Sequence, residues 1–363
     1  MATTWLYNNG SFDELRFAIP ANENQASFQI LNPNNPADGN TDNDGDGLIS
    51  REFLEWSGSL VPFDQHARRI RVLIMKQPLF ILSFLCLACA AVSAKPGESW
   101  AYLDNGTLRI GVDQSRGAAI GYFALSKDQR NLLNHHDEGR FIQQSYYGNK
   151  DDSMWAKKPW SYNPVQGGSY KGEDSKTLEF RKTERELYAK IEPLHWANAK
   201  TCPEAIMQEW ITLDGPLAKV RMRMDFTGET QEKAAHQEMP AMFVDFDLPH
   251  LIFEKEGKLV RHQPVFLGEK QGPQKISYDT GWLAYVDDKD FGIGIYTPGT
   301  KDAVNYRHRG NGSTGPTGSA CSYVAPIRTI KLTKGEAVDY EFYLTIGTLE
   351  EIRARFAKLG AKP

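Results

Sequence analysis

The residues best suited to chemistry crowd into one segment, residues 139–172, with the sequence GRFIQQSYYGNKDDSMWAKKPWSYNPVQGGSYKG. Aromatic rings and amide or guanidinium groups are interleaved there, and little aliphatic character follows Ile142. Sites for small polar ligands such as sugars combine flat apolar surfaces with a few placed polar groups, and this segment supplies both. The candidate substrate-binding residues are Arg140, Gln143, Trp155, Trp160, Tyr162, Asn163 and Gln166. The alternative is a surface loop that its own aromatic side chains pin in place.

Acid–base chemistry on a sugar needs two groups that transfer protons near the reacting carbon. His195 follows a predicted strand beside Trp196, so it is a candidate acid next to a stacking surface. His236 and Glu238 are two residues apart, so both side chains face the same way on an extended strand. They could act as base and orienting partner, or as metal ligands. Tyr147 could remove the proton beside a uronate carboxylate, and the alternative for each residue is a half-buried polar side chain satisfied by the backbone.

Further polar residues are secondary candidates for catalysis or glycan binding. Glu209 lies on a predicted strand, where it could be catalytic or could pair with an arginine. Arg307, His308 and Arg309 add positive charge suited to an acidic glycan. The loop that follows, GNGSTGPTGS, lacks the Gly-Lys-Ser/Thr ending of a nucleotide-binding loop, so we expect a flexible connection.

Residues 75–94, MKQPLFILSFLCLACAAVSA, have the features of a secretory signal peptide. Lys76 supplies a positive start, residues 79–91 form an apolar block, and the segment ends in Val-Ser-Ala. The block is shorter than the roughly 20 apolar residues that span a bilayer. We therefore expect an exported protein, periplasmic or extracellular, with no membrane span after cleavage. A buried helix is the alternative, and Cys86 and Cys89 lack a good lipid-attachment motif, so a lipoprotein is not favoured.

The segment before the signal peptide, residues 1–74, has a separate character. Its Asn-, Asp-, Gly- and Pro-rich part favours turns over a packed core, so we expect a poorly ordered extension or a misassigned start. Asp42, Asp44 and Asp46 match the beginning of a calcium loop, but Phe53 occupies the position of the closing acid. Ca²⁺ is the cofactor that this pattern indicates, and the rest of the chain requires none.

Composition narrows the class of protein. The net charge of −4 offers no basic surface for nucleic acid. The region after the signal, residues 95–363, suits one large β domain or two small ones. Cys202 and Cys321 remain there, and they could form one disulfide or stay separate buried residues.

Period-two alternation of apolar and polar residues dominates from Trp100 onward. Strands are predicted at residues 108–112, 119–125, 178–181, 187–191, 206–213, 219–226, 241–246, 281–286, 292–296, 322–332 and 338–346. Irregular stretches are expected at residues 149–174, 229–237 and 307–319. A helix closes the chain, because Thr348 and Glu351 form a capping box and Ile352 and Phe356 share a face. The pattern predicts an all-β antiparallel sandwich with one C-terminal helix.

Several segments resemble the galactose-mutarotase-like β-supersandwich superfamily. They are YLDNGTLRIGVDQSRGAAIGYFAL, HDEGRFIQQSYYG, GWLAYVDDKDFGIGIYTP and KLTKGEAVDYEFYLTIG. The resemblance implies an antiparallel β-supersandwich over residues 95–363 and a Gly-Arg segment at Arg140 that borders a sugar site. The superfamily includes aldose epimerases, supersandwich domains of polysaccharide lyases and glycosidases, and binding modules, so fold similarity does not choose the chemistry. Aldose epimerases use a late glutamate base, and the tract at residues 296–316 contains no Glu.

These observations predict an exported protein that binds a carbohydrate, with acidic glycans among the candidates, and processes it by acid–base chemistry of the lyase or glycosidase type. The alternatives are a non-catalytic carbohydrate-binding module and an aldose 1-epimerase.

Overall fold

The computed structural model describes residues 27–28, 70–71, 99–268 and 272–360. The chain divides into two units, Met1–Ala88 and Cys89–Pro363. In the first unit the described residues form a short antiparallel pair, β1 (Ser27–Phe28) with β2 (Ile70–Arg71). The predicted signal peptide and the predicted calcium loop at Asp42, Asp44 and Asp46 lie outside the described residues.

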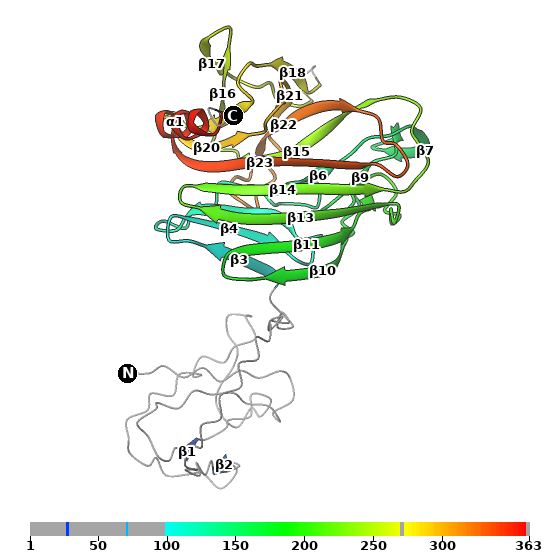
Figure 1. Cartoon of the computed structure of the whole chain (residues 1–363), viewed down its shortest axis with the longest axis horizontal. Helices are drawn as coiled ribbons and strands as arrows, with labels where there is room; N and C mark the ends of the chain where they lie inside the picture. The colour runs from blue at the N-terminus through cyan, green and yellow to red at the C-terminus, as the bar shows by residue number, and fades with distance from the viewer. Residues whose placement is uncertain (1–26, 29–69, 72–98, 269–271, 361–363) are drawn as a thin grey trace. The chain divides into compact units, whose positions relative to one another are not determined.

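The second unit is built on two large antiparallel sheets and one short hairpin (Figure 1). The nine-stranded sheet has the order β10 (Lys176–Lys182), β11 (Glu186–Glu192), β13 (Ala205–Asp214), β14 (Leu217–Phe226), β23 (Ala337–Thr348), β20 (Phe291–Tyr296), β19 (Trp282–Val286), β16 (His250–Lys255), β17 (Lys258–His262). The ten-stranded sheet has the order β18 (Gln274–Ser277), β21 (Asp302–His308), β22 (Cys321–Ile330), β15 (Ala235–Asp245), β6 (Ile142–Ser145), β5 (Ala119–Leu125), β4 (Leu108–Asp113), β3 (Trp100–Asp104), with β9 (Pro164–Val165) and β12 (Leu194–His195) attached beside β6. The hairpin pairs β7 (Lys150–Trp155) with β8 (Lys158–Ser161).

The hydrophobic core lies between the inner faces of these two sheets. Burial alternates along β13 and β14, so every second side chain enters the core and its neighbours point away. Val220 and Met222 from the nine-stranded sheet share this core with Ile110 and Val324 from the ten-stranded sheet. The predicted sandwich is therefore confirmed, and its all-β class with it.

The helix α1 (Leu349–Gly360) follows β23 directly and packs on β19, β20 and β23. The Thr348 backbone N–H donates to Glu351 Oε2 at 2.8 Å and the Glu351 backbone N–H to Thr348 Oγ1 at 3.3 Å, which confirms the predicted capping box. Ile352 and Phe356 come so close to β20 that only glycine fits at Gly294. Within the described part of the chain, no helical segment combines the length and apolar character needed to cross a membrane.

Three sequence-based predictions need correction. Residues 149–174 are not wholly irregular, because they contain β7, β8 and β9. Likewise β15 begins at Ala235 and β21 runs to His308, inside two stretches expected to be irregular. Of the two alternatives for Cys202 and Cys321, the structure has separate buried thiols.

Candidate functional site

A row of aromatic side chains lies on the outer face of the ten-stranded sheet, away from the core. Met242 and Val324 face the core, so their strand neighbours Phe243 and Tyr323 face outward. The register places Phe243 opposite Tyr323 and Tyr323 opposite Tyr306, on three adjacent strands. The ring centroids are 4.6 Å apart in the first pair and 4.4 Å in the second. This row forms the floor of the candidate site.

A carboxyl group on β15, that of Glu238, lies beside this floor. The hydroxyl groups of Tyr147 and Tyr323 both donate to Glu238 Oε1, the first at 3.3 Å. Pairing of β15 with β22 is irregular between Glu238 and Met242, which leaves room for this arrangement. Burial raises the pKa of Glu238 above its ordinary value, although its hydroxyl donors oppose the change. A carboxyl group in this state can hold a proton and release it, as a general acid must.

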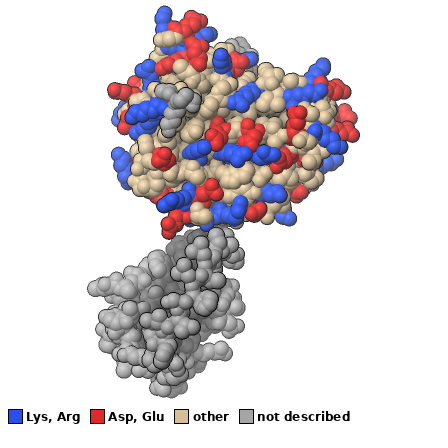
Figure 2. Space-filling view, in the orientation of Figure 1, with Lys and Arg blue, Asp and Glu red and all other residues tan. Residues whose placement is uncertain are grey.

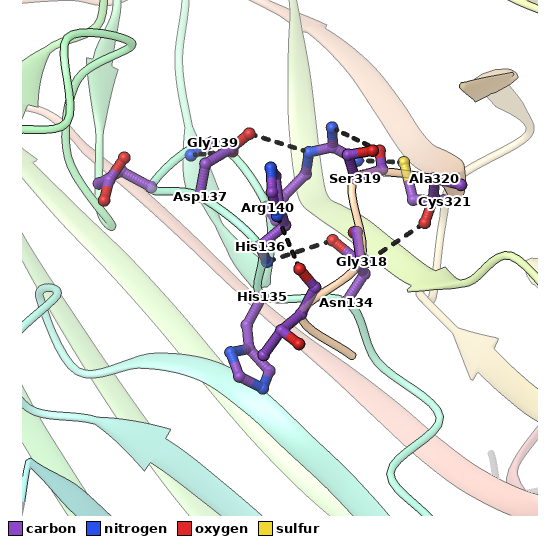
Figure 3. Close-up of polar contacts among 12 residues, drawn as sticks. Asn134, His135, His136, Asp137, Gly139, Arg140, Gly318, Ser319, Ala320 and Cys321 are labelled. Carbon is purple, nitrogen blue, oxygen red and sulfur yellow. Dashed lines mark hydrogen bonds and ion pairs between the residues drawn. The ribbon is translucent and has the colours of Figure 1, made fainter. Parts of the chain in front are cut away.

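Arg140 supplies the positive charge of the site and is only 9% exposed. Its guanidinium donates to the Cys321 sulfur and, at 3.3 Å, to the Ser319 carbonyl oxygen (Figure 3). Its Nε lies 3.4 Å from the Asp137 carboxylate, whose side chain is 41% exposed. Burial raises the pKa of Cys321 to about 11, so this partner is a neutral thiol. Arg140 is thus a nearly buried cation whose carboxylate partner remains in contact with solvent.

Two loops far apart in the sequence hold Arg140 in place. The Asn134 side-chain amide donates to the carbonyl oxygens of Gly318 at 2.7 Å and Ala320 at 3.3 Å (Figure 3). His136 Nδ1 lies 2.7 Å from the Thr317 carbonyl oxygen. The Gly-rich loop expected to be a flexible connection is therefore bonded to the segment that carries Arg140, and it helps to fix that side chain.

His308 ends β21 directly opposite Cys321 on β22. Its Nδ1 is buried and has no hydrogen-bond partner among the described residues. Burial, and next the positive charge of Arg140, lower the pKa of His308 below its ordinary value. These effects favour the neutral form of the His308 imidazole.

A wall of indole rings borders this floor. Trp160 lies 6.3 Å from Tyr147 between ring centroids, Trp155 lies 4.7 Å from Trp160, and Trp196 lies 6.1 Å from Trp155. Trp196 packs on Gly139, where a Cβ atom would come within 2.4 Å of the indole. Because Gly139 directly precedes Arg140, a continuous set of contacts connects Glu238, through the indole rings, to Arg140.

We name the floor and its charged groups the Arg140–Glu238 cluster. Its members are Arg140, Tyr147, Glu238, Phe243, Tyr306, His308, Cys321 and Tyr323. Arg140, Tyr147 and Glu238 were predicted as site residues from the sequence, as were Trp155 and Trp160 in the wall. Tyr306 and Tyr323 were not, and Trp196 was named only as a stacking surface beside His195. The signal for the two tyrosines was the alternation of their strands, which places them on one face with His308.

Three predicted sugar-binding amides lie elsewhere and are at most 2% exposed. Gln143 accepts from the Gly167 backbone N–H at 2.6 Å and Gln166 donates to the Gly117 carbonyl oxygen at 3.1 Å. Asn163 donates to the Tyr146 carbonyl oxygen at 2.8 Å. Because these three amides are hydrogen-bonded to backbone groups, they stabilise the fold and are left out of the cluster.

The remaining predicted residues also have partners outside the cluster. His195 is 2% exposed, and its Nε2 lies 2.7 Å from Asp151 Oδ2. The hydroxyl of Tyr162 donates to Glu204 at 2.6 Å. His236 shares the outer face with Glu238, yet its ring nitrogen pairs with Thr329 Oγ1 at 2.9 Å.

No group of three His, Cys, Asp or Glu side chains that could hold a metal ion occurs among the described residues. An open hollow of about 520 Å³ lies at the start of α1 and is lined by Asp290, Thr348, Leu349, Glu350 and Arg353. It shares no residue with the Arg140–Glu238 cluster.

No family model matches this chain, and no curated protein sequence matches it. Several solved structures do match this chain. A galactose mutarotase-related enzyme from Lactobacillus acidophilus is 12% identical, with a TM-score of 0.43 over 68% of this chain and 97% of that one. A galactose mutarotase-like protein from Lactobacillus casei is 10% identical, with a TM-score of 0.44 over 68% and 99%.

A third match is the 4-alpha-glucanotransferase from Thermococcus litoralis, at 11% identity and a TM-score of 0.40 over 69% of this chain and 38% of that one. At such identities and TM-scores, these matches leave the chemistry of this chain to be argued from the cluster itself.

Proposed function

We propose that the Arg140–Glu238 cluster binds an acidic glycan and cleaves it by β-elimination. One observation carries the proposal: Arg140 is a buried cation whose carboxylate partner, 3.4 Å away, is 41% exposed, and the nearby His308 has a buried ring nitrogen without a hydrogen-bond partner among the described residues. Burying a charge costs free energy that close pairing offsets, so such a site favours an anion that adds to the pairing. The carboxylate of a uronic acid is an anion of suitable shape for a guanidinium.

The proposed reaction uses groups on both sides of the cluster. His308 removes the proton from the carbon next to the sugar carboxylate, and Arg140 stabilises the negative charge that spreads onto the carboxylate. The bond between the neighbouring carbon and the glycosidic oxygen then breaks, and a carbon–carbon double bond forms. Glu238, held by Tyr147 and Tyr323, gives its proton to the leaving oxygen. The atoms and electrons of this elimination balance without water, a metal ion or a redox partner.

The protonation states support these roles. Free histidine and glutamate, with pKa values of 6.5 and 4.5, are poorly matched as base and acid, because the imidazole is protonated where the carboxyl keeps its proton. Burial lowers the pKa of His308 and raises that of Glu238, so the neutral imidazole and the neutral carboxyl coexist over a wider pH range.

The indole wall supplies the apolar part of the site. Trp155 and Trp160 are only partly buried, so their rings can stack against sugar C–H faces while Arg140 holds the acidic group. Export, which residues 75–94 indicate, would bring the protein to polysaccharides outside the cytoplasm, and it forms part of this proposal.

The experiment is to incubate the full chain with a panel of uronic-acid glycans and to follow the ultraviolet absorbance of the unsaturated product. We expect a rise with at least one glycan and none with the His308→Gln variant. Calorimetric titration with the same panel separates the outcomes. Binding without product on any glycan overturns elimination and leaves a binding module, whereas neither binding nor product overturns the site as a whole.

A further inference from the structure

The β7–β8 hairpin carries both Trp155 and Trp160, and a contact between a histidine and a carboxylate helps to join it to the rest of the domain. His195, on β12, lies 2.7 Å through its Nε2 from Asp151 Oδ2 at the start of β7. The other carboxylate oxygen of Asp151 accepts from the backbone N–H and the hydroxyl of Ser153, at 3.2 and 2.6 Å. One side chain thus ties the hairpin internally and anchors it to the sheet.

The direction of the His195–Asp151 hydrogen bond follows from the second ring nitrogen. The Ala197 backbone N–H donates to His195 Nδ1 at 3.0 Å, so that nitrogen is an acceptor and carries no proton. The ring proton therefore sits on Nε2 and is donated to Asp151. Both nitrogens of this buried ring are occupied, which fixes the ring and suits it to positioning rather than to proton transfer.

The hairpin is also held by the pairing of β7 with β8, by ring contacts of its indoles and by a hydrogen bond from Trp160 Nε1 to Asn163 Oδ1 at 3.2 Å. Its turn residues Ala156 and Lys157 have φ values of 48° and 64°, a left-handed conformation that is unfavourable for residues other than glycine. Its Trp155 and Trp160 pack at an interplanar angle of 68°. The exposed charged residues of β7 and β8 add no buried area. The His195–Asp151 hydrogen bond, with a buried imidazole and a carboxylate that is 28% exposed, is therefore a further restraint on where the indoles lie.

We propose that His195 and Asp151 are a positioning pair, which holds the β7–β8 hairpin so that Trp155 and Trp160 form the wall of the glycan site. This inference rests on the proposed function for its ligand, but the position of the indoles can be measured without any ligand. The pair acts through the hairpin and touches no reacting atom.

The first test is spectroscopic. Two indoles 4.7 Å apart at a fixed angle couple excitonically and give a paired band in circular dichroism. We expect Asp151→Ala to lose most of this band and Asp151→Asn to lose part of it, because the amide keeps one acceptor. The matched control is Asp152→Asn: Asp152 is exposed, and its φ of 61° is one that Asn adopts readily. A band that is unchanged in Asp151→Ala overturns the proposal.

The second test uses the glycan that the wild type cleaves. A positioning role predicts that Asp151→Asn raises KM by about tenfold while kcat changes by less than about threefold. A fall in kcat at constant KM overturns the positioning role and returns His195 to the chemistry. If no glycan is cleaved, the proposed function fails, whereas the spectroscopic test still decides the positioning pair.

Discussion

The two sheets bury their inner faces in the same core and differ in the faces they turn outward. On the nine-stranded sheet, Lys219 pairs with Glu341 at 2.8 Å and Arg221 with Asp339 at 2.6 Å, across β14 and β23. Figure 2 shows this face as a row of alternating blue and red side chains. On the ten-stranded sheet the outer face carries aromatic rings, the buried Arg140 and the partly buried Glu238.

The difference between the two outer faces shows which charged side chains indicate a functional site. Exposed ion pairs keep much of their hydration and contribute roughly 0–1 kcal/mol, so their number says little about function. A buried charge costs several kcal/mol unless its pairing is complete. Arg140 combines burial with incomplete pairing, whereas Arg221 is 43% exposed and close to its carboxylate. A ligand is therefore expected at Arg140 and not at Arg221.

The largest effect is expected from Glu238→Gln. The glutamine keeps the volume and can accept from Tyr147 and Tyr323, but it cannot deliver a proton to a leaving oxygen. We expect the rate of product formation to fall by about 10²–10⁴-fold with glycan affinity nearly unchanged, measured by absorbance and calorimetry. Retention of more than half the rate would remove Glu238 from the mechanism.

Arg140→Gln should come next. Removing the guanidinium takes away the group that pairs with the glycan carboxylate, so affinity for an acidic glycan should fall by about 10²-fold. The comparison variant is Arg221→Gln on the opposite sheet, whose affinity should match the wild type. Equal losses in both variants would mean that the two faces are not functionally different.

A third test separates two buried carboxyls, Glu238 on an outer face and Glu209 in the core. Burial raises the pKa of Glu209 from 4.5 to about 8, with Gln166 opposing the change. A raised pKa stabilises the folded chain below the ordinary value and loses that contribution as pH rises through the shifted value. The wild-type free energy of unfolding should therefore fall between pH 4.5 and about 8, by an amount on the order of a few kcal/mol.

Glu209→Gln should flatten this slope, because the amide does not ionise. Urea unfolding at several pH values measures it, and glycan cleavage by this variant should stay near the wild-type rate. A slope that persists in Glu209→Gln would assign the effect to another buried group.

The strands of this fold could be predicted because their signal is local. Alternation in β14 and the capping box of α1 depend on neighbours a few residues apart, and both predictions are confirmed. The start of β15 was missed because Ala235 pairs with Ile330, far away along the chain, and β21 was not predicted at all. Non-local pairing leaves no periodic mark in a single segment.

The candidate site could be predicted only in part for a related reason. Arg140, Trp155 and Trp160 were recognised because one segment concentrates rings and polar groups. Tyr306 and Tyr323 come from strands that meet this segment only in the folded sheet. Gln143 and Gln166 have the right chemistry for a sugar, but the fold uses their amides for backbone groups, and residue type alone does not reveal that use.

The smallest effect is expected on the charged face, from Asp339→Asn. Hydrogen bonds from Arg221, and next from Arg223, hold the pKa of Asp339 below its ordinary value of 3.8, so its contribution to stability is present above that pH and is lost on acidification. Because these side chains are largely exposed, the free energy of unfolding near pH 7 should fall by no more than about 1 kcal/mol, and added salt should reduce the difference. Glycan affinity should stay the same in Asp339→Asn. The matched variant is Asp137→Asn, beside Arg140, in which glycan affinity should change. A loss of several kcal/mol in Asp339→Asn, or a loss of glycan binding, would show that the charged face does more than keep one side of the sandwich in water.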